Sequence, residues 1–498
     1  MADRARAAGT PTARLPWASA VAGPAGLAAI FVSALVTFTV AVLGPSVVEP
    51  RLPGGGPPFD LAAHPGPHLV ITLSAVAVIA GACGLALVLF ASGRGWSVTP
   101  RALLISGFVL TVALALMPPF GSADHLNYAA YGRMVVLGHN PYTTGAVNMP
   151  GDPIADTVEA PWREEVSVYG PLASAVQAFA SWIGGDSVRL TIFVLALLNA
   201  AAFILAGWLL YRYARDPAGR LRAVLLWTLN PLLLYQLVAG LHVDTLGIAL
   251  SVAALVALRR TELGSGVLLG LAVAVKATVG LALGGLLWVR RSRRRALAWV
   301  LGGFVVTAGV AYAAGGPHVL DQTRSAARMV SLAVPWHLVA PHLDGALGHA
   351  TSRQIISVAT VVLTVVLAIL LLRSLAGPAD DPDGSGEAFR ISAALNIAWL
   401  FASSYVLPWY DGVAYALLAP LPRNRFDGVI VARTLVVSLA YLPARVVPLP
   451  ADLGWLLTVG RAQIAPWLML GILAALVIQS RRGSRPRAAA QAPAPPAA

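Results

Sequence analysis

The chain has 498 residues, of which 57% are hydrophobic and only 11% charged, and it carries a formal net charge of +13. A soluble protein would have roughly 25% charged residues, so the composition excludes a soluble domain with a single membrane anchor. The arginines lie in short loops between apolar segments, which is typical of the cytoplasmic loops of membrane proteins and argues against nucleic-acid binding.

Apolar segments follow one another along most of the chain. The first is too long for the core of a signal peptide, so we expect it to be retained. The predicted fold class is all-α, a polytopic transmembrane helical protein with about 12–14 membrane segments. The segments lie at about 22–44, 68–91, 102–119, 188–212, 222–240, 244–258, 264–289, 296–314, 354–373, 391–407, 411–422, 428–443 and 461–480.

One membrane domain is expected at 21–482, between two tails. Residues 1–20 and 483–498 are rich in Ala, Pro and Arg, a composition that favours disorder over a packed core. The domain is expected to hold two large polar loops, 118–187 and 315–352.

Arginine counts at successive loops predict the orientation. With the N-terminus inside, every inner loop is basic, and the loops 118–187 and 315–352 lie outside the cytoplasm. Within the first of these, residues 169–184 form an amphipathic stretch of the kind that lies along a membrane surface. The inner arginines are Arg94 and Arg101, Arg212–Arg222, Arg259 and Arg260, Arg290–Arg295, Arg373–Arg390, Arg423 and Arg425, and Arg481–Arg487.

The tract 264–289 breaks this alternation unless it turns back, because Arg259, Arg260 and Arg290–Arg295 flank it on both sides. We therefore expect two short halves meeting near Lys276, which a membrane tolerates where the turn lines an aqueous cavity. Lys276 is the only lysine, and a lysine within a span costs about 2.5–3.5 kcal/mol on insertion scales. Its partner is either the phosphate of a ligand or, as a structural alternative, an aspartate.

Acidic residues are scarce, and two of them stand at outer ends of spans. Asp124 follows the third span and is suited to act as a general base towards an acceptor hydroxyl; the alternative is a loop carboxylate that caps the next helix. His242 and Asp244 occupy a very short outer turn. Asp244 either caps the following helix or lies beside Asp124 as a second catalytic carboxylate.

Other residues on the outer side are suited to an anionic or sugar ligand. Arg133, Arg328 and Arg353 break the positive-inside trend and suit phosphate, although an isolated arginine is more often solvated. The histidines lack the spacing of a metal site, so we expect no metal and no cofactor. Aromatic and histidine side chains predicted to line a pocket, or else to form the interfacial belt, are His125, Tyr128, Tyr131, His242, Trp336, His337, Trp409 and Tyr410.

The run Asp124–Tyr142 resembles the first catalytic loop of actinobacterial polyprenol-phosphomannose-dependent α-1,6-mannosyltransferases, membrane glycosyltransferases of the GT-C class. Supporting matches occur in the expected order along the chain. They are Val168–Leu172, Asn230-Pro231 through Gly240–Asp244, Val275–Ala277 and Pro408–Tyr410.

The resemblance implies a metal-independent, inverting transfer from a polyprenyl-phosphate sugar, usually mannose, to an extracytoplasmic glycan or glycolipid. It also implies that Asp124 is the base, that His242 and Asp244 match the family's His-Asn-Asp segment, with Val243 replacing the Asn, and that Lys276 is the intramembrane lysine. The alternative is a lipid flippase, which predicts inverted repeats and polar residues across the bilayer midplane. Because the candidate residues collect on one side, we favour the transferase.

Overall fold

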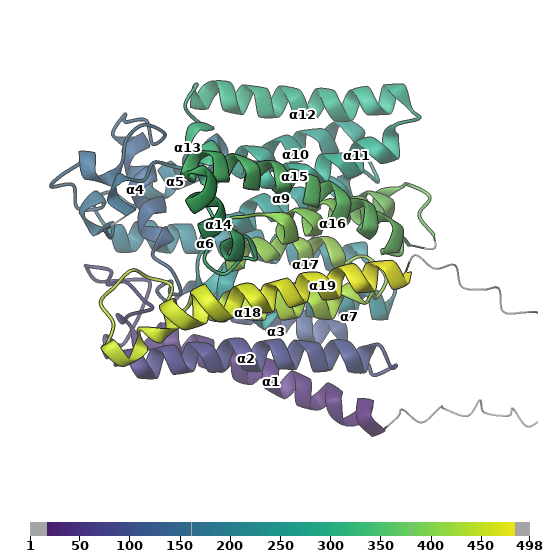
Figure 1. Cartoon of the computed structure of the whole chain (residues 1–498), viewed down its shortest axis with the longest axis horizontal. Helices are drawn as coiled ribbons and strands as arrows, with labels where there is room; N and C mark the ends of the chain where they lie inside the picture. The colour runs from purple at the N-terminus through teal and green to yellow at the C-terminus, as the bar shows by residue number, and fades with distance from the viewer. Residues whose placement is uncertain (1–16, 161, 379, 484–498) are drawn as a thin grey trace, which may run out of the picture.

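The computed structural model describes residues 17–160, 162–378 and 380–483. Every regular element within these ranges is helical, which confirms the predicted all-α class. The long helices run side by side across the view in Figure 1, with α4 and α5 gathered at one end of the bundle. The predicted tails fall almost entirely at 1–16 and 484–498, outside the described residues.

Seven helical segments of the described chain are long and apolar enough to cross a membrane, so the protein is a multi-pass membrane protein. Four shorter apolar helices accompany them: α3 (Pro100–Ala115), α9 (Asp244–Ala257), α10 (Glu262–Val275) and the run Ala277–Arg290. The seven are α1 (Trp17–Leu43), α2 (Pro67–Ser92), α6 (Val188–Tyr213), the run Pro217–Ala239 from α7 to η5, α12 (Arg294–Gly315), α15 (His349–Ser374) and the run Ala451–Arg482 that contains α19 (Ala465–Gly483).

The remaining helices are short or lie in the loops. The predicted spans 391–407, 411–422 and 428–443 correspond to the three helices α16, α17 and α18. The bounds are α4 (Asp124–Val136), α5 (Pro171–Gly184), α7 (Pro217–Ala223), α8 (Pro231–Leu233), α11 (Leu283–Arg290), α13 (Asp321–Ala326), α14 (Trp336–Leu347), α16 (Ser385–Ala402), α17 (Gly412–Leu418) and α18 (Phe426–Tyr441), and the segments η1 to η9 are 3₁₀- or π-helical.

Loops that the arginine counts assign to one side of the membrane do meet at one end of the molecule. Arg215 forms an ion pair with Asp380 at 3.3 Å, and Arg259 pairs with Asp383 at 3.4 Å. A third loop joins them, because Arg290 donates a hydrogen bond of 2.9 Å to the Asp383 carbonyl. This arginine-rich end lies opposite the end that carries α4 and α5 (Figure 1).

The predicted turn at Lys276 is confirmed. The helix α10 ends at Val275, and Lys276 adopts an extended backbone with φ −151° before η6 (Ala277–Ala282) and α11 lead back. The two ends of this hairpin meet, because Arg290 lies 3.3 Å from Glu262 and donates to the Leu258 carbonyl at 3.1 Å. With 14 residues, α10 is about 21 Å long and does not cross a hydrocarbon core of about 30 Å.

The tip of the hairpin is held by the loop that precedes α5. The Gly170 amide donates a 2.9 Å hydrogen bond to the Val275 carbonyl, the last carbonyl of α10. A Cβ atom at position 170 would overlap the Ala274 carbonyl oxygen, so this approach requires glycine. The stretch predicted at 169–184 is thus anchored at its start and continues as α5, which exposes Phe179 and Trp182 along one face.

A fully buried ion pair joins α18 to the turn η7 (Pro408–Asp411). Arg433 contacts the Asp411 carboxylate, and the two side chains are 0% and 1% exposed. Arg433 also donates to the Leu400 carbonyl at 3.0 Å, and Thr434 donates to Asp411 at 2.8 Å. Because Trp409 and Tyr410 directly precede Asp411, this pair anchors the backbone that carries these two aromatic residues.

Breaking this pair is expected to destabilise the fold. Arg433→Met leaves the Asp411 charge buried and unpaired, which costs about 3–5 kcal/mol. The measurement is the thermal unfolding midpoint of the purified protein in detergent. The double variant Asp411→Leu/Arg433→Met removes both charges and is expected to regain most of the loss; an unchanged midpoint in Arg433→Met alone would contradict the structural role.

Candidate active site

Four segments converge at the α4 end of the bundle. They are the N-terminus of α4, the turn between η5 (Leu234–Ala239) and α9, the break at Lys276, and the turn η7. Of the residues predicted for the site, Asp124, His242, Asp244 and Lys276 come together here. Trp409 of η7 joins them, because its ring stacks on the His242 imidazole.

Asp124 is the partly exposed acid of this cluster, with 31% of its side chain accessible. It is the first residue of α4, and its carboxylate lies 3.7 Å from His242 Nε2. The Tyr128 hydroxyl, one helical turn further on, donates to the same carboxylate oxygen at 3.4 Å. The carboxylate is therefore held by buried neighbours while one side remains open to a ligand.

The surroundings tune Asp124 towards proton transfer. Burial, followed by the negative charge of Asp244, raises the pKa of Asp124 to about 6, and Lys276 and Tyr128 offset only part of this rise. A base with a pKa near the working pH is the most effective one, because it is ionised yet still binds a proton.

His242 presents a neutral ring nitrogen to Asp124. Burial lowers the pKa of His242 to about 3, so the imidazole is uncharged. Its Nδ1 faces the Gln236 carbonyl and therefore carries the hydrogen, which leaves the Nε2 lone pair facing Asp124 and the Ser122 hydroxyl. The neutral Nε2 therefore lies 3.7 Å from the Asp124 carboxylate without adding a positive charge beside it.

Lys276 is paired with Asp244. The sequence had offered two partners for this lysine, a ligand phosphate or an aspartate, and the structure shows the aspartate. The side chains of Lys276 and Asp244 are 11% and 6% exposed. The ammonium also lies 3.8 Å from the Tyr410 ring centroid and 5.7 Å from that of Tyr169. Asp244 is not the cap of α9, because the cap position is Val243, and its Oδ2 has no hydrogen-bond partner within the described chain.

Aromatic side chains surround these charges. The hydroxyls of Tyr128 and Tyr169 lie 2.9 Å apart, and their rings pack edge to face at 5.2 Å. The rings of Trp409 and His242 stack at 3.6 Å, which fixes the plane of the imidazole. The Tyr131 hydroxyl turns away to the Glu165 carbonyl at 3.1 Å.

The three predicted phosphate-binding arginines occupy different positions. Arg133 lies on the last turn of α4, about 13 Å along the helix axis from Asp124, and is held by Asp152 at 2.7 Å and Asp186 at 2.6 Å. Arg353 pairs with Asp344 at 3.0 Å near the start of α15. Arg328 is exposed, and no carboxylate partner for it occurs among the described residues.

Arg328 belongs to a segment that bridges the two sides of the site. Before it, the Thr323 hydroxyl donates to the Val168 carbonyl at 3.2 Å. After it, the Ser404 hydroxyl donates to the Met329 carbonyl at 3.0 Å. The segment therefore lies between the loop that holds the Lys276 hairpin and the segment that leads to Trp409.

The other predicted lining residues make no contact with the charged side chains that the structure gives as a hydrogen bond or ion pair within the described residues. His125 is 0% exposed, and its ring nitrogens have no hydrogen-bond partner within the described chain. Trp336 is half-buried and donates to the Ala402 carbonyl at 2.7 Å, and His337 beside it is also half-buried.

Several site residues were not anticipated from the sequence. Ser122 contacts both His242 and the backbone of Asp124, each at 3.3 Å, and its position two residues before the acid was a signal for such a contact. Gln177 and Asn199 line a cavity of about 100 Å³ behind Tyr128, large enough for about three waters. Nothing in the local sequence of α5 or α6 marks these two amides.

Comparison with known proteins places this cluster in a family. Residues 21–292, more than half of the chain, match the family model described as alpha-(1->6)-mannopyranosyltransferase, N-terminal domain. The matched region contains Asp124, His242, Asp244 and Lys276, whereas Arg328, Trp409 and Tyr410 lie beyond it.

Curated relatives carry the same name. The chain is 31% identical to alpha-(1->6)-mannopyranosyltransferase A of Corynebacterium glutamicum over 185 residues, which are 36% of this chain and 37% of the relative. It is also 31% identical to the enzyme of that name from Mycobacterium tuberculosis over 201 residues, 40% of this chain and 38% of the relative. The alignments thus span less than two fifths of either relative's length.

A third relative is alpha-(1->6)-mannopyranosyltransferase B of C. glutamicum, 27% identical over 136 residues, or 27% of this chain and 23% of the relative. No solved structure matches the chain. The family match covers more than half of the sequence and includes the acid, histidine and lysine that converge in the structure. This chain belongs to the alpha-(1->6)-mannopyranosyltransferase family.

Proposed function

We propose that the protein is an inverting mannosyltransferase that moves mannose from a polyprenyl-phosphate donor to a hydroxyl of a glycan or glycolipid outside the cytoplasm. The observation that carries the proposal is the position of a partly open carboxylate, Asp124, beside the buried Lys276–Asp244 pair, within the region that matches the family. The location of the arginine-rich loops at the opposite end supports an extracytoplasmic site.

In the proposed reaction, Asp124 accepts the proton of the acceptor hydroxyl. The acceptor oxygen forms a bond to the anomeric carbon while the bond from that carbon to the phosphate oxygen breaks on the opposite face. The proton then remains on Asp124, which faces the neutral His242 Nε2 at 3.7 Å. Positioning and charge compensation are sufficient here, because a lipid phosphate is already a good leaving group.

The leaving group gains negative charge during this step, since a phosphodiester with one charge becomes a phosphate monoester with two. Lys276 stabilises that charge in the proposal. Its ammonium has three donor hydrogens, one of which Asp244 uses. Arg328 is a second candidate, because it is exposed on the segment that links the loop at Val168 to the segment at Ser404.

A groove along α15 suits the prenyl chain of such a donor. It has a cavity volume of about 700 Å³, begins at Trp336 and Gln354 and continues past Ala359 to Val366. From Gln354 to Val366 the helix rises about 18 Å, which is close to one leaflet of about 15 Å. Arg353 directly precedes the outer end of this groove.

Filling this groove is expected to weaken donor binding. Ala359→Trp should raise the KM for a long-chain polyprenyl-phosphate-mannose several-fold while leaving kcat within about two-fold, since the groove contacts only the non-reacting chain. Val361→Trp is the matched control, because Val361 lies on the same helix and is 63% exposed outside the groove. Equal KM values for the two variants would argue against this path for the prenyl chain.

The function is tested by following radiolabelled mannose from polyprenyl-phosphate-mannose into membrane glycans in the presence of EDTA. Wild-type protein reconstituted in liposomes is expected to transfer label to the acceptor, and a polyprenyl-phosphate-glucose donor is expected to compete poorly. Movement of the donor between leaflets without transfer would support a flippase instead.

The pH dependence of transfer should report the ionisation of Asp124. Only the deprotonated carboxylate accepts a proton, so the rate should fall below pH 6, approaching ten-fold per unit. Asp244→Asn removes a negative charge that raises the pKa of Asp124, and residual transfer by this variant should therefore fall off at a lower pH. The measurement is the initial rate of transfer at subsaturating donor between pH 4.5 and 8. If the acidic fall in rate occurs at the same pH in wild type and in Asp244→Asn, the ionisation of Asp124 is not its cause.

A further inference from the structure

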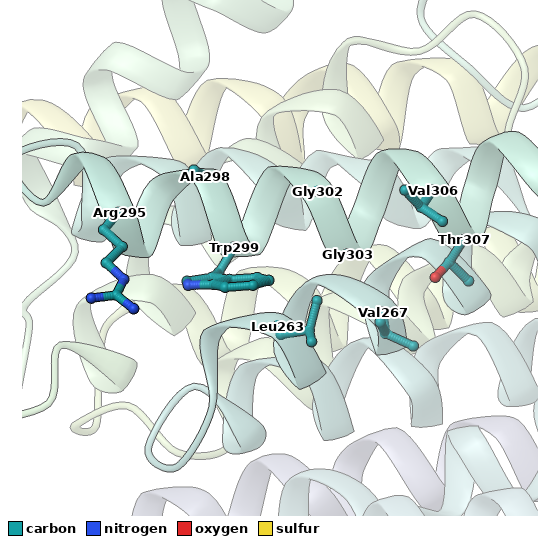
Figure 2. Close-up of a pocket in the computed structure, with 9 residues that line it drawn as sticks. All are labelled: Leu263, Val267, Arg295, Ala298, Trp299, Gly302, Gly303, Val306 and Thr307. Carbon is teal, nitrogen blue, oxygen red and sulfur yellow. The ribbon is translucent and has the colours of Figure 1, made fainter.

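A second groove runs along the lipid-facing side of the bundle between α10 and α12. Its cavity volume is about 530 Å³. Figure 2 shows Leu263 and Val267 of α10 on one side, with Arg295 and Trp299 projecting from α12 towards them, and Gly302 further along. Apart from Arg295 at one end, the walls are almost entirely apolar.

The protein itself does not fill this groove. Trp299 and Val306 are 51% and 64% exposed, and the described residues buried on α12 are only Val300 and Gly303. A Cβ atom built at Gly302 meets no atom within 4 Å, so space is open above this glycine. In a membrane, this space is occupied by a lipid chain or by another apolar surface.

The end of the groove carries positive charge that the protein leaves uncompensated. Arg295 is exposed, and beside it Arg291, Arg293 and Arg294 are exposed as well. Ion pairs to carboxylates are recorded for none of these four in the described chain, whereas the neighbouring Arg290 pairs with Glu262. Basic pockets between helices at a membrane boundary are suited to the headgroups of anionic lipids.

We propose that this groove binds an anionic phospholipid, with one acyl chain along α12 and the phosphate held by Arg295 and its neighbouring arginines. The dimensions fit one leaflet. From Arg295 to Thr307 the helix rises about 18 Å, and half of a hydrocarbon core of about 30 Å is about 15 Å. The headgroup thus meets the arginines when the chain end reaches the bilayer midplane.

A second copy of the chain is a less suitable occupant. Two copies related by an axis along the membrane normal would place their arginine clusters on the same side and next to each other. Eight exposed guanidinium groups, from the four arginines of each copy, would then repel one another across the contact. A phosphate headgroup instead neutralises the cluster.

The test is native mass spectrometry of the full chain, released from nanodiscs that contain phosphatidylglycerol and phosphatidylcholine in graded ratios. Wild type is expected to retain one phosphatidylglycerol molecule in preference to phosphatidylcholine. Loss of one arginine contact should weaken retention about five-fold in Arg295→Gln. Gly302→Leu fills the groove and should lower retention of the lipid without disturbing the fold, because no protein atom lies within 4 Å of the new Cβ.

Gly309→Leu is the matched control. Gly309 lies on α12 about two turns beyond Gly302, its Cβ position is equally open, and it does not line the groove. Retention equal to wild type is expected for this variant. The proposal is overturned if Gly302→Leu and Gly309→Leu retain the lipid equally, if phosphatidylcholine is retained as well as phosphatidylglycerol, or if Gly302→Leu instead converts a dimer to a monomer.

Discussion

Asp124→Asn is expected to reduce mannose transfer by about 10²–10⁴-fold, the range in which a general base contributes to catalysis. The substitution preserves the size of the side chain and its place at the start of α4, but the amide does not accept the proton of the acceptor hydroxyl. The donor should still bind, so the loss should fall on kcat. The measurement is the initial rate of label transfer in proteoliposomes at equal protein content.

Asp156→Asn is a suitable control for this change. Asp156 belongs to the same polar loop, 118–187, is 45% exposed and pairs with Arg163 at 2.9 Å at the surface. Its substitution should leave transfer within about two-fold of wild type, because exposed ion pairs contribute little to stability. Transfer by Asp124→Asn at the wild-type rate would show that Asp124 is not the general base, although the protein would still be a transferase.

Lys276→Gln is expected to abolish transfer, but it also leaves Asp244 buried without a partner. Breaking a buried pair in this way costs about 3–5 kcal/mol, so the single variant does not separate folding from chemistry. The informative protein is the double variant Lys276→Gln/Asp244→Asn, which removes both charges and keeps both shapes. We expect its unfolding midpoint to be close to that of wild type.

Transfer by the double variant should nevertheless stay at least about 10²-fold below wild type, since a group that stabilises developing charge contributes about that much. Thermal unfolding and label transfer are measured on the same preparation. If the double variant regains both stability and transfer, Lys276 serves only to pair with Asp244, and the leaving phosphate is neutralised elsewhere, with Arg328 as the next residue to replace.

The sequence predicted the Lys276 hairpin because several arginines at each end of a segment are a strong indication that both ends lie on the same side of the membrane. Arginines on both sides of 264–289 required an even number of crossings, and the structure joins those ends through Arg290 and Glu262. The contact between Asp124 and His242 was harder to predict from the sequence. The two residues are 118 positions apart, and no periodic pattern encodes a contact over that distance. Their common placement at outer ends of spans left a shared site open as one alternative, and the resemblance to a family favoured it.

For Arg133 and Arg353, the predicted side of the membrane did not identify the binding partner. Arg133 and Arg353 were selected because they stand on the outer side, yet each is paired with acids that the sequence also places there. The sidedness of a charge does not determine its partner, because the ion pair depends on how the loop folds. Asp344, nine residues before Arg353, was the one local signal that this arginine had a competing partner.

The meeting of both hairpin ends at one face has a consequence for how the protein is inserted into the membrane. A segment whose two ends stay on the same side is not translocated, and only its tip advances, to about 21 Å from its anchored ends. The helices before and after the hairpin therefore acquire their orientations independently of it. A variant that lacks residues 262–290 should insert α12 in the same orientation as wild type, although it would also lack Lys276.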